Sequence, residues 1–130
     1  MVRGFDMIRD FPEPERFTLN CPTQQILDVL ANKWSVIVLY CLAYGPRRYN
    51  QIQQRIEGIS QKVLTQTLRR LERHGLVART VLSEMPPNVE YSLTSLGESL
   101  LEPLQAISDW SRAHFSDVAA ARNQYDEVGD

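Results

Sequence analysis

The sequence predicts one mainly α-helical domain that carries a small β-hairpin. Leucines recur at 3.6-residue spacing between Ser60 and Gly75, which is typical of an amphipathic helix with an N-cap serine and a left-handed glycine stop. Two strand-like segments flank residues 85–88, a turn-like stretch with two prolines, and a second leucine stripe follows Thr94. With 130 residues, of which 43% are hydrophobic, the chain can bury one modest core.

The N-terminal third of the chain predicts an arm and two helices. Residues 1–20 contain two prolines among mixed charges and show no period, which indicates an extended arm. Cys21 and Pro22 open a helix that ends near Asn32, because proline fits the first helical position. The next helix, 34–44, is apolar nearly all round and therefore central to the core. The expected core residues are Ile26, Leu30, Val36, Leu39, Leu64, Leu68 and Leu71.

The middle of the chain predicts a winged helix-turn-helix. A short helix capped by Tyr49–Asn50 ends at Gly58, and the longer helix capped by Ser60 follows at once. Segments 76–82 and 89–93 are strand-like, and the hairpin tip between them forms the wing. In this arrangement the second helix enters the major groove of DNA.

The last predicted helix begins at the cap Thr94, and Pro103 is expected to kink it. Since the domain already has enough core residues, part of its apolar stripe should bury against a second copy of the chain. The stripe, which we expect to form the dimerisation surface, consists of Leu96, Leu100, Leu104, Ile107 and Trp110. The domain body then covers 21–115, and the small and charged residues 116–130 predict a frayed tail.

Charge is distributed very unevenly along the chain. The formal net charge is −2, yet segment 45–80 has eight basic and two acidic residues, whereas segment 81–130 has two basic and nine acidic ones. A local basic surface on an acidic protein is compatible with binding to double-stranded DNA.

The exposed face of the Ser60 helix offers amides, a hydroxyl and cations. Residues near its N-terminus are expected to read base edges: Gln61, Lys62, Thr65 and Gln66. Residues expected at the DNA backbone are Arg47, Arg48, Asn50, Ser60, Arg69 and Arg73. On the wing, Arg79 and Asn88 are the candidates, although Glu84 would be repelled by phosphate. The alternatives are a merely solvated helix surface and a winged-helix protein-interaction module without sequence-specific DNA binding.

The order of short motifs resembles the HxlR family of bacterial transcription regulators. The motifs are Cys21-Pro22, Lys33-Trp34, Gly45-Pro46-Arg47-Arg48-Tyr49, the run Gly58 to Thr65, Leu68-Arg69-Arg70-Leu71-Glu72, Gly75-Leu76-Val77 and the run Pro86 to Gly97. The resemblance covers roughly residues 20–112. It implies a homodimeric winged helix-turn-helix regulator, most often a repressor of a pseudo-palindromic operator, with Cys21 at the position that senses oxidants or electrophiles in some members.

The two cysteines have different settings. Cys21 lies beside a helix N-terminus, where partial positive charge favours the reactive thiolate, but Pro22 removes one N–H group and no cation is close in sequence. A redox or electrophile-sensing role and inert packing therefore both stay open. Cys41 lies in the apolar run 36–43 and is expected to be largely buried. A small-molecule inducer between the terminal helix and the core is also open, although no polar cluster marks its site.

The sequence predicts neither an enzyme nor a cofactor. His74 and His114 fall on different elements, and no cysteine or histidine pair has the spacing of metal ligands. No glycine-rich phosphate loop or nucleophile elbow is present. No segment approaches the ~20 apolar residues of a membrane span, so we expect a cytoplasmic, nucleoid-associated protein that binds no membrane.

Overall fold

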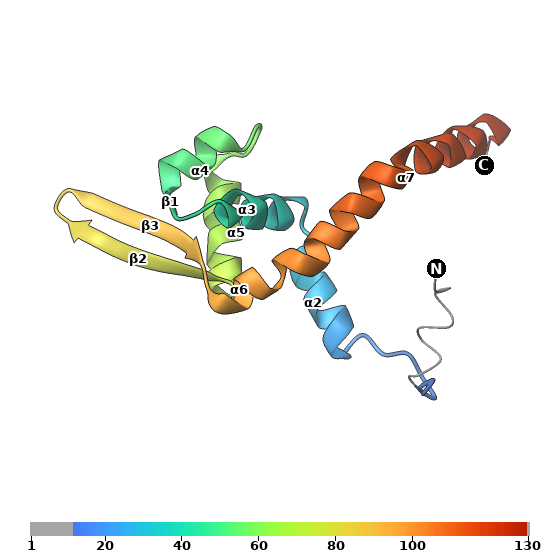
Figure 1. The fold of residues 1–130 in the computed structure, drawn as a ribbon, viewed down its shortest axis with the longest axis horizontal. Coiled ribbons are helices and arrows are strands. Elements are labelled where there is room, and N and C mark those ends of the chain that lie inside the picture. The colour runs from blue at the N-terminus through green and yellow to red at the C-terminus, as the bar shows by residue number, and fades with distance from the viewer. Residues whose placement is uncertain (1–11, 130) are drawn as a thin grey trace.

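The structure of the chain, a computed structural model, describes residues 12–129 and is a group of helices with a hairpin that projects on one side (Figure 1). Its elements in chain order are α2 (Pro22–Leu30), α3 (Lys33–Ala43), β1 (Arg47–Arg48), α4 (Tyr49–Arg55), α5 (Gln61–Arg73), β2 (Val77–Glu84), β3 (Pro87–Leu93), α6 (Ser95–Ser99) and α7 (Leu101–Val128). The predicted fold class, mainly α with a winged helix-turn-helix, is confirmed. Of the predicted arm, residues 12–20 contain no helix or strand, and residues 1–11 lie outside the described part.

The core lies where α3, α4 and α5 meet the base of the hairpin (Figure 1). Leu39, Leu64, Leu68 and Leu71 are fully buried there, as predicted, and Leu30 and Val36 pack against them half-buried. The prediction for Ile26 was wrong: its side chain is 50% exposed, whereas that of Val29 is 5% exposed. The reason is that α2 leaves the core toward its N-terminus, so only its last turn is covered (Figure 1).

Two caps define the helix-turn-helix. The Ser60 hydroxyl accepts the N–H of Val63 at 3.1 Å, as the sequence predicted for the start of α5. The predicted cap of α4 at Tyr49–Asn50 was wrong, because Arg48 is the N-cap. Its backbone N–H donates to the side-chain carbonyl oxygen of Gln51 at 2.8 Å, so the glutamine amide closes the helix end.

The sheet has three antiparallel strands in the order β1-β3-β2. Both β2 and β1 pair with β3, and Tyr91 of β3 lies opposite Arg79 on one side and Arg47 on the other. The hairpin tip is shorter than predicted, because Asn88 already pairs with Ser83 across the strands. The sequence analysis missed β1, which has only two residues and so shows no periodicity.

The C-terminal region differs most from prediction. Thr94 caps a helix as expected, but that helix, α6, is short, and α7 starts after a break at Leu100. Pro103 lies in the first turn of α7, where proline is tolerated, so the interruption precedes it. The predicted frayed tail and the boundary at residue 115 were wrong: α7 continues to Val128. Alanines at 119–121 favour helix, and Gly129 ends it in the left-handed conformation.

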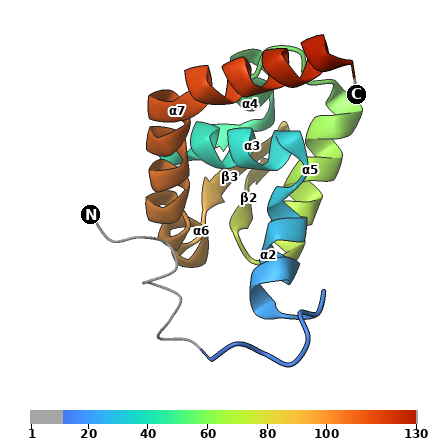
Figure 2. The same cartoon turned by 90° about the vertical axis from the view of Figure 1, so that its right-hand side faces the viewer.

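Helix α7 extends away from the wing, so the two long projections leave the core on opposite sides (Figure 1). It changes direction part-way along, which the second view shows (Figure 2). Among residues 12–129, no single helix is long and apolar enough to cross a membrane; α2 and α3 reach that length only together, as a pair bent by 82°.

Candidate nucleic-acid interface

Helix α5 has two chemically distinct faces. Leu64, Thr67, Leu68 and Leu71 are buried against the core. The exposed residues are Gln61, Lys62, Gln66, Arg69, Glu72 and Arg73. Five of these six side chains supply hydrogen-bonding amides and cations, which is the chemistry that base edges and phosphates recognise, and the one carboxylate, Glu72, lies in the last turn.

Tyr49 of α4 fixes the N-terminal turn of α5, a role that the sequence analysis missed. Its hydroxyl donates to the backbone carbonyl oxygen of Gln61 at 2.8 Å and lies 2.9 Å from the hydroxyl oxygen of Thr65. Tyrosine has one hydroxyl proton, and the carbonyl can only accept, so Thr65 donates its own proton to the tyrosine oxygen. Thr65 is half-buried and keeps only acceptor capacity toward solvent.

Three predicted backbone and wing residues meet at the hairpin tip. Arg48 and Asn50, at the start of α4, line a hollow together with Asn88 and the two prolines beside it. Arg48 and Asn50 are exposed, whereas Asn88 is half-buried. The N-terminus of α4 and the wing tip therefore form one continuous surface.

A second hollow lies between α5 and the sheet. Arg69 and Arg79 line it, and Glu72 lies with them. The carboxylate of Glu72 offsets part of the positive charge at this edge.

Two arginines of the basic segment lie elsewhere. The Nε of Arg47, a predicted backbone contact, donates to the carbonyl oxygen of Cys41 at 2.9 Å, and its side chain lines a cavity between α3 and α4. Arg70, in α5, donates to the carbonyl oxygen of Asp28 and so ties α5 to α2. The structure does not bring Arg47 to the exposed face of α5.

The two thiols also differ in their surroundings. Cys21 is exposed at the N-cap of α2, where its sulfur accepts the N–H of Gln24 at 3.4 Å. Cys41 is only half-buried, less than predicted. Burial raises the pKa of the Cys41 thiol, and the nearby Arg47 and Arg55 oppose that shift. Neither cysteine belongs to a cluster of metal-ligating side chains in the part of the chain that the structure describes.

The leucine stripe that the sequence assigned to dimerisation divides into two parts. Leu104 is 4% exposed and Leu100 is half-buried, so both belong to the domain's own core. Ile107 and Trp110 are 60% and 57% exposed, and Leu96 is exposed as well. The outer part of the stripe is therefore an apolar surface without cover in the single chain.

A basic amphipathic helix held against a short helix and a hairpin wing defines a winged helix-turn-helix protein that binds DNA. The sequence matches the HxlR-like helix-turn-helix family over residues 29–119, and the chain belongs to this family. The resemblance found in the sequence motifs is confirmed.

Known relatives agree with this assignment. The chain is 36% identical to the HTH-type transcriptional regulator YtfH of Escherichia coli (strain K12) over 112 residues, which cover 86% of this chain and 89% of the relative. The solved structure of YtfH from Salmonella typhimurium matches with a TM-score of 0.71 at 34% identity, over 85% of this chain and 99% of that one. The solved structure of the redox regulator HypR in its reduced form matches with a TM-score of 0.72 at 34% identity, over 77% of this chain and 99% of that one. The protein is a DNA-binding transcriptional regulator.

Proposed function

We propose that this regulator binds a pseudo-palindromic operator as a homodimer on the nucleoid and represses the adjacent genes. The observation that carries the proposal is the exposed face of α5, which is polar and cationic over its first turns and lies beside the wing. A twofold dimer places two such helices about 34–36 Å apart, one turn of DNA, so that each reads half of the site.

Base readout falls to the N-terminal half of α5. Gln61 and Gln66 carry amides that match adenine, and Lys62 matches the acceptor edge of guanine. Thr65 acts as an acceptor, because its own hydroxyl already donates a hydrogen bond to the Tyr49 oxygen, and so favours the amino groups of cytosine or adenine.

Phosphate contact falls to the flanks of this surface. Arg48 and Asn50 lie at the N-terminus of α4 beside the wing tip, which supports contact with the backbone on one side of the groove. The remaining proposed contacts are Ser60, Arg69 and Arg73 on α5 and Arg79 and Asn88 on the wing.

Dimerisation is supported by apolar side chains that the single chain leaves exposed. Leu96, Ile107 and Trp110 extend the α6–α7 stripe beyond the core, and Ile26 on α2 is half exposed. An exposed apolar surface of this kind on a small domain is typical of a subunit interface.

Substitutions that separate readout from positioning test the proposal. Lys62→Ala or Gln66→Ala should reduce the free energy of operator binding by about 1–3 kcal/mol and relax sequence specificity. Arg48→Ala should weaken binding to all DNA sequences alike and lower the slope of log affinity against log salt concentration by about 1. Binding is measured by fluorescence anisotropy over a salt series. Arg112→Ala, on exposed α7, is the matched control. An unchanged operator affinity in both α5 variants would remove the assignment of base readout.

We further propose that the Cys21 thiol is a redox or electrophile switch. Its support is its exposure at a helix N-terminus and the similarity of the chain to HypR, a redox regulator. Oxidation would join two subunits through a disulfide, with loss of two thiol protons and two electrons to the oxidant, and a quinone would form an adduct. A gel shift before and after treatment tests it. Treatment should abolish operator binding by the parent protein and leave binding by Cys21→Ser unchanged. If treatment affects both proteins equally, Cys21 is not the switch.

A further inference from the structure

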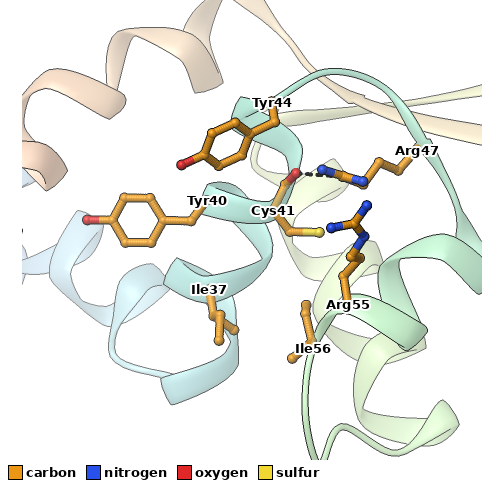
Figure 3. A pocket seen from close by; sticks show the side chains of 7 residues that line it. All are labelled: Ile37, Tyr40, Cys41, Tyr44, Arg47, Arg55 and Ile56. Carbon is orange, nitrogen blue, oxygen red and sulfur yellow. Dashed lines mark hydrogen bonds between the residues drawn. The ribbon is translucent and has the colours of Figure 1, made fainter.

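A cavity of about 380 Å³ lies between α3, β1 and α4, away from the exposed face of α5 (Figure 3). Ile37, Ile56 and the exposed Tyr44 supply apolar walls. Arg47 and Arg55 supply the opposite, cationic side. Its size is within the range of about 300–1,000 Å³ that is usual for small-molecule sites.

In the described part of the chain, no carboxylate lines the cationic side of the cavity. Figure 3 shows the guanidinium groups of Arg47 and Arg55 next to one another beside the sulfur of Cys41. Within residues 12–129, no carboxylate makes an ion pair with either group. Burial raises the pKa of the Cys41 thiol, so the thiol stays neutral at pH 7 and does not balance the charge. An anion between the two guanidinium groups would relieve their repulsion.

The hydrogen bonding of Arg47 and the apolar walls together indicate the kind of anion that suits the cavity. The Nε of Arg47 is already held by the carbonyl oxygen of Cys41 at 2.9 Å, which leaves its terminal N–H groups to bind two oxygens side by side, as a carboxylate presents them. The apolar walls then take a hydrophobic body. We propose that this cavity is an effector site for an organic carboxylate with an aromatic or branched aliphatic body. The inference rests on the proposed function, because an effector presupposes operator binding that it changes.

The residues that line the cavity connect it to the wing, to the helix-turn-helix and to α7. Arg47 belongs to β1, which pairs with β3 of the wing, and Arg55 is the last residue of α4, just before the turn into α5. Tyr40, on the cavity wall, donates its hydroxyl to the carbonyl oxygen of Leu104 in α7 at 2.8 Å. A ligand that draws the two arginines together therefore acts on the wing, the helix-turn-helix and the terminal helix at once. By linkage, ligand and operator change each other's affinity by the same factor.

Protein-observed NMR of the full chain tests the site without DNA. Benzoate, 2-naphthoate and 3-methylbutanoate are titrated, with 2-naphthamide as the neutral counterpart. We expect saturable shifts at residues 37–56 for at least one carboxylate, and at least about tenfold weaker binding of the amide and in Arg55→Gln. Arg112→Gln, which changes charge on α7, should bind as the parent does. The absence of saturable shifts with all three carboxylates, or equal binding of the amide, would overturn the proposal.

Protection of the Cys41 thiol supplies a second readout in the Cys21→Ser protein. A bound carboxylate should slow alkylation of Cys41 by iodoacetamide, and Arg55→Gln should remove the protection. Unprotected Cys41 at saturating carboxylate would place the ligand elsewhere and overturn the assignment.

Operator binding distinguishes the failure of this inference from that of the proposed function. A carboxylate that fills the cavity should shift the operator affinity, and an unchanged affinity overturns the effector role alone. Absence of specific operator binding by the untreated protein overturns the proposed function, while the NMR titration still reports on the cavity.

Discussion

Gly97→Ala tests how the terminal helices are joined to the DNA-binding unit. Gly97 is buried in α6, and a Cβ there would lie 2.1 Å from the carbonyl oxygen of Leu76 and 3.1 Å from its carbonyl carbon. The glycine has no left-handed conformation that would itself disfavour alanine. Helix propensity alone therefore predicts that alanine stabilises the protein by up to about 1 kcal/mol.

Packing predicts the opposite effect, a loss of stability. Backbone cannot yield as a flexible side chain can, so α6 must move by about 1 Å to restore van der Waals contact. That movement strains two hydrogen bonds from Thr94, from its N–H to Leu76 at 3.1 Å and from its hydroxyl to Gly75 at 2.6 Å. Overpacking costs about 1–3 kcal/mol and each weakened hydrogen bond about 0.5–1.5 kcal/mol. After the propensity gain of up to about 1 kcal/mol, we expect a net loss of about 1–5 kcal/mol in the free energy of unfolding.

Urea denaturation followed by circular dichroism measures this loss. The protomer concentration must be fixed, because dimerisation would make stability depend on it. Ser95→Ala, at an exposed position of the same helix, is the matched control and should stay within about 0.5 kcal/mol of the parent. A Gly97→Ala protein as stable as the parent, or more so, would refute the close contact between α6 and Leu76, in the turn between α5 and β2.

Four further predictions concern the interface, the dimer and the Cys41 thiol. Tyr49→Phe removes the hydroxyl that anchors the first turn of α5. The variant should be less stable by about 0.5–1.5 kcal/mol and should bind the operator more weakly when binding is measured by anisotropy. If stability and affinity are both unchanged, Tyr49 does not anchor α5. Trp110→Ala should weaken dimerisation at least about tenfold in sedimentation velocity with little change in circular dichroism, since the ring is 57% exposed; an unchanged dimer would exclude this surface. Cys41 should react with iodoacetamide more slowly than Cys21 at pH 8, because burial raises its pKa. The raised pKa of Cys41 also makes the free energy of unfolding depend on pH. Its contribution to stability is fully present below the ordinary thiol pKa of about 8.5 and is lost as the pH rises through the raised pKa of the folded state. Urea titrations of the Cys21→Ser protein from pH 7 to 10 will detect this loss.

The elements with strong periodicity were predictable from the sequence. The α5 helix, its Ser60 cap and its leucine face required only residue spacing, because buried leucines at 3.6-residue intervals have few alternative structures. The Thr94 cap followed from the same local chemistry. These local signals positioned most of the candidate interface.

The features that failed depend on long-range contacts. Ile26 has the spacing of a core residue, but where α2 leaves the core is a matter of tertiary packing. β1 forms only because β3 lies beside it. The direction of Arg47, toward Cys41 instead of α5, depends on the fold of α3 and β1 together. The alanines within the helical residues 116–128 favour a helix, but the charged residues around them led to the prediction of a frayed tail.

The most direct test of operator binding is a gel shift of the purified protein on its own upstream intergenic DNA, with unrelated DNA of equal length as competitor. We expect a saturable complex that survives an excess of the unrelated DNA, and loss of that preference in Lys62→Ala. Equal displacement by both DNAs would contradict sequence-specific operator binding and would favour a winged-helix module that contacts proteins.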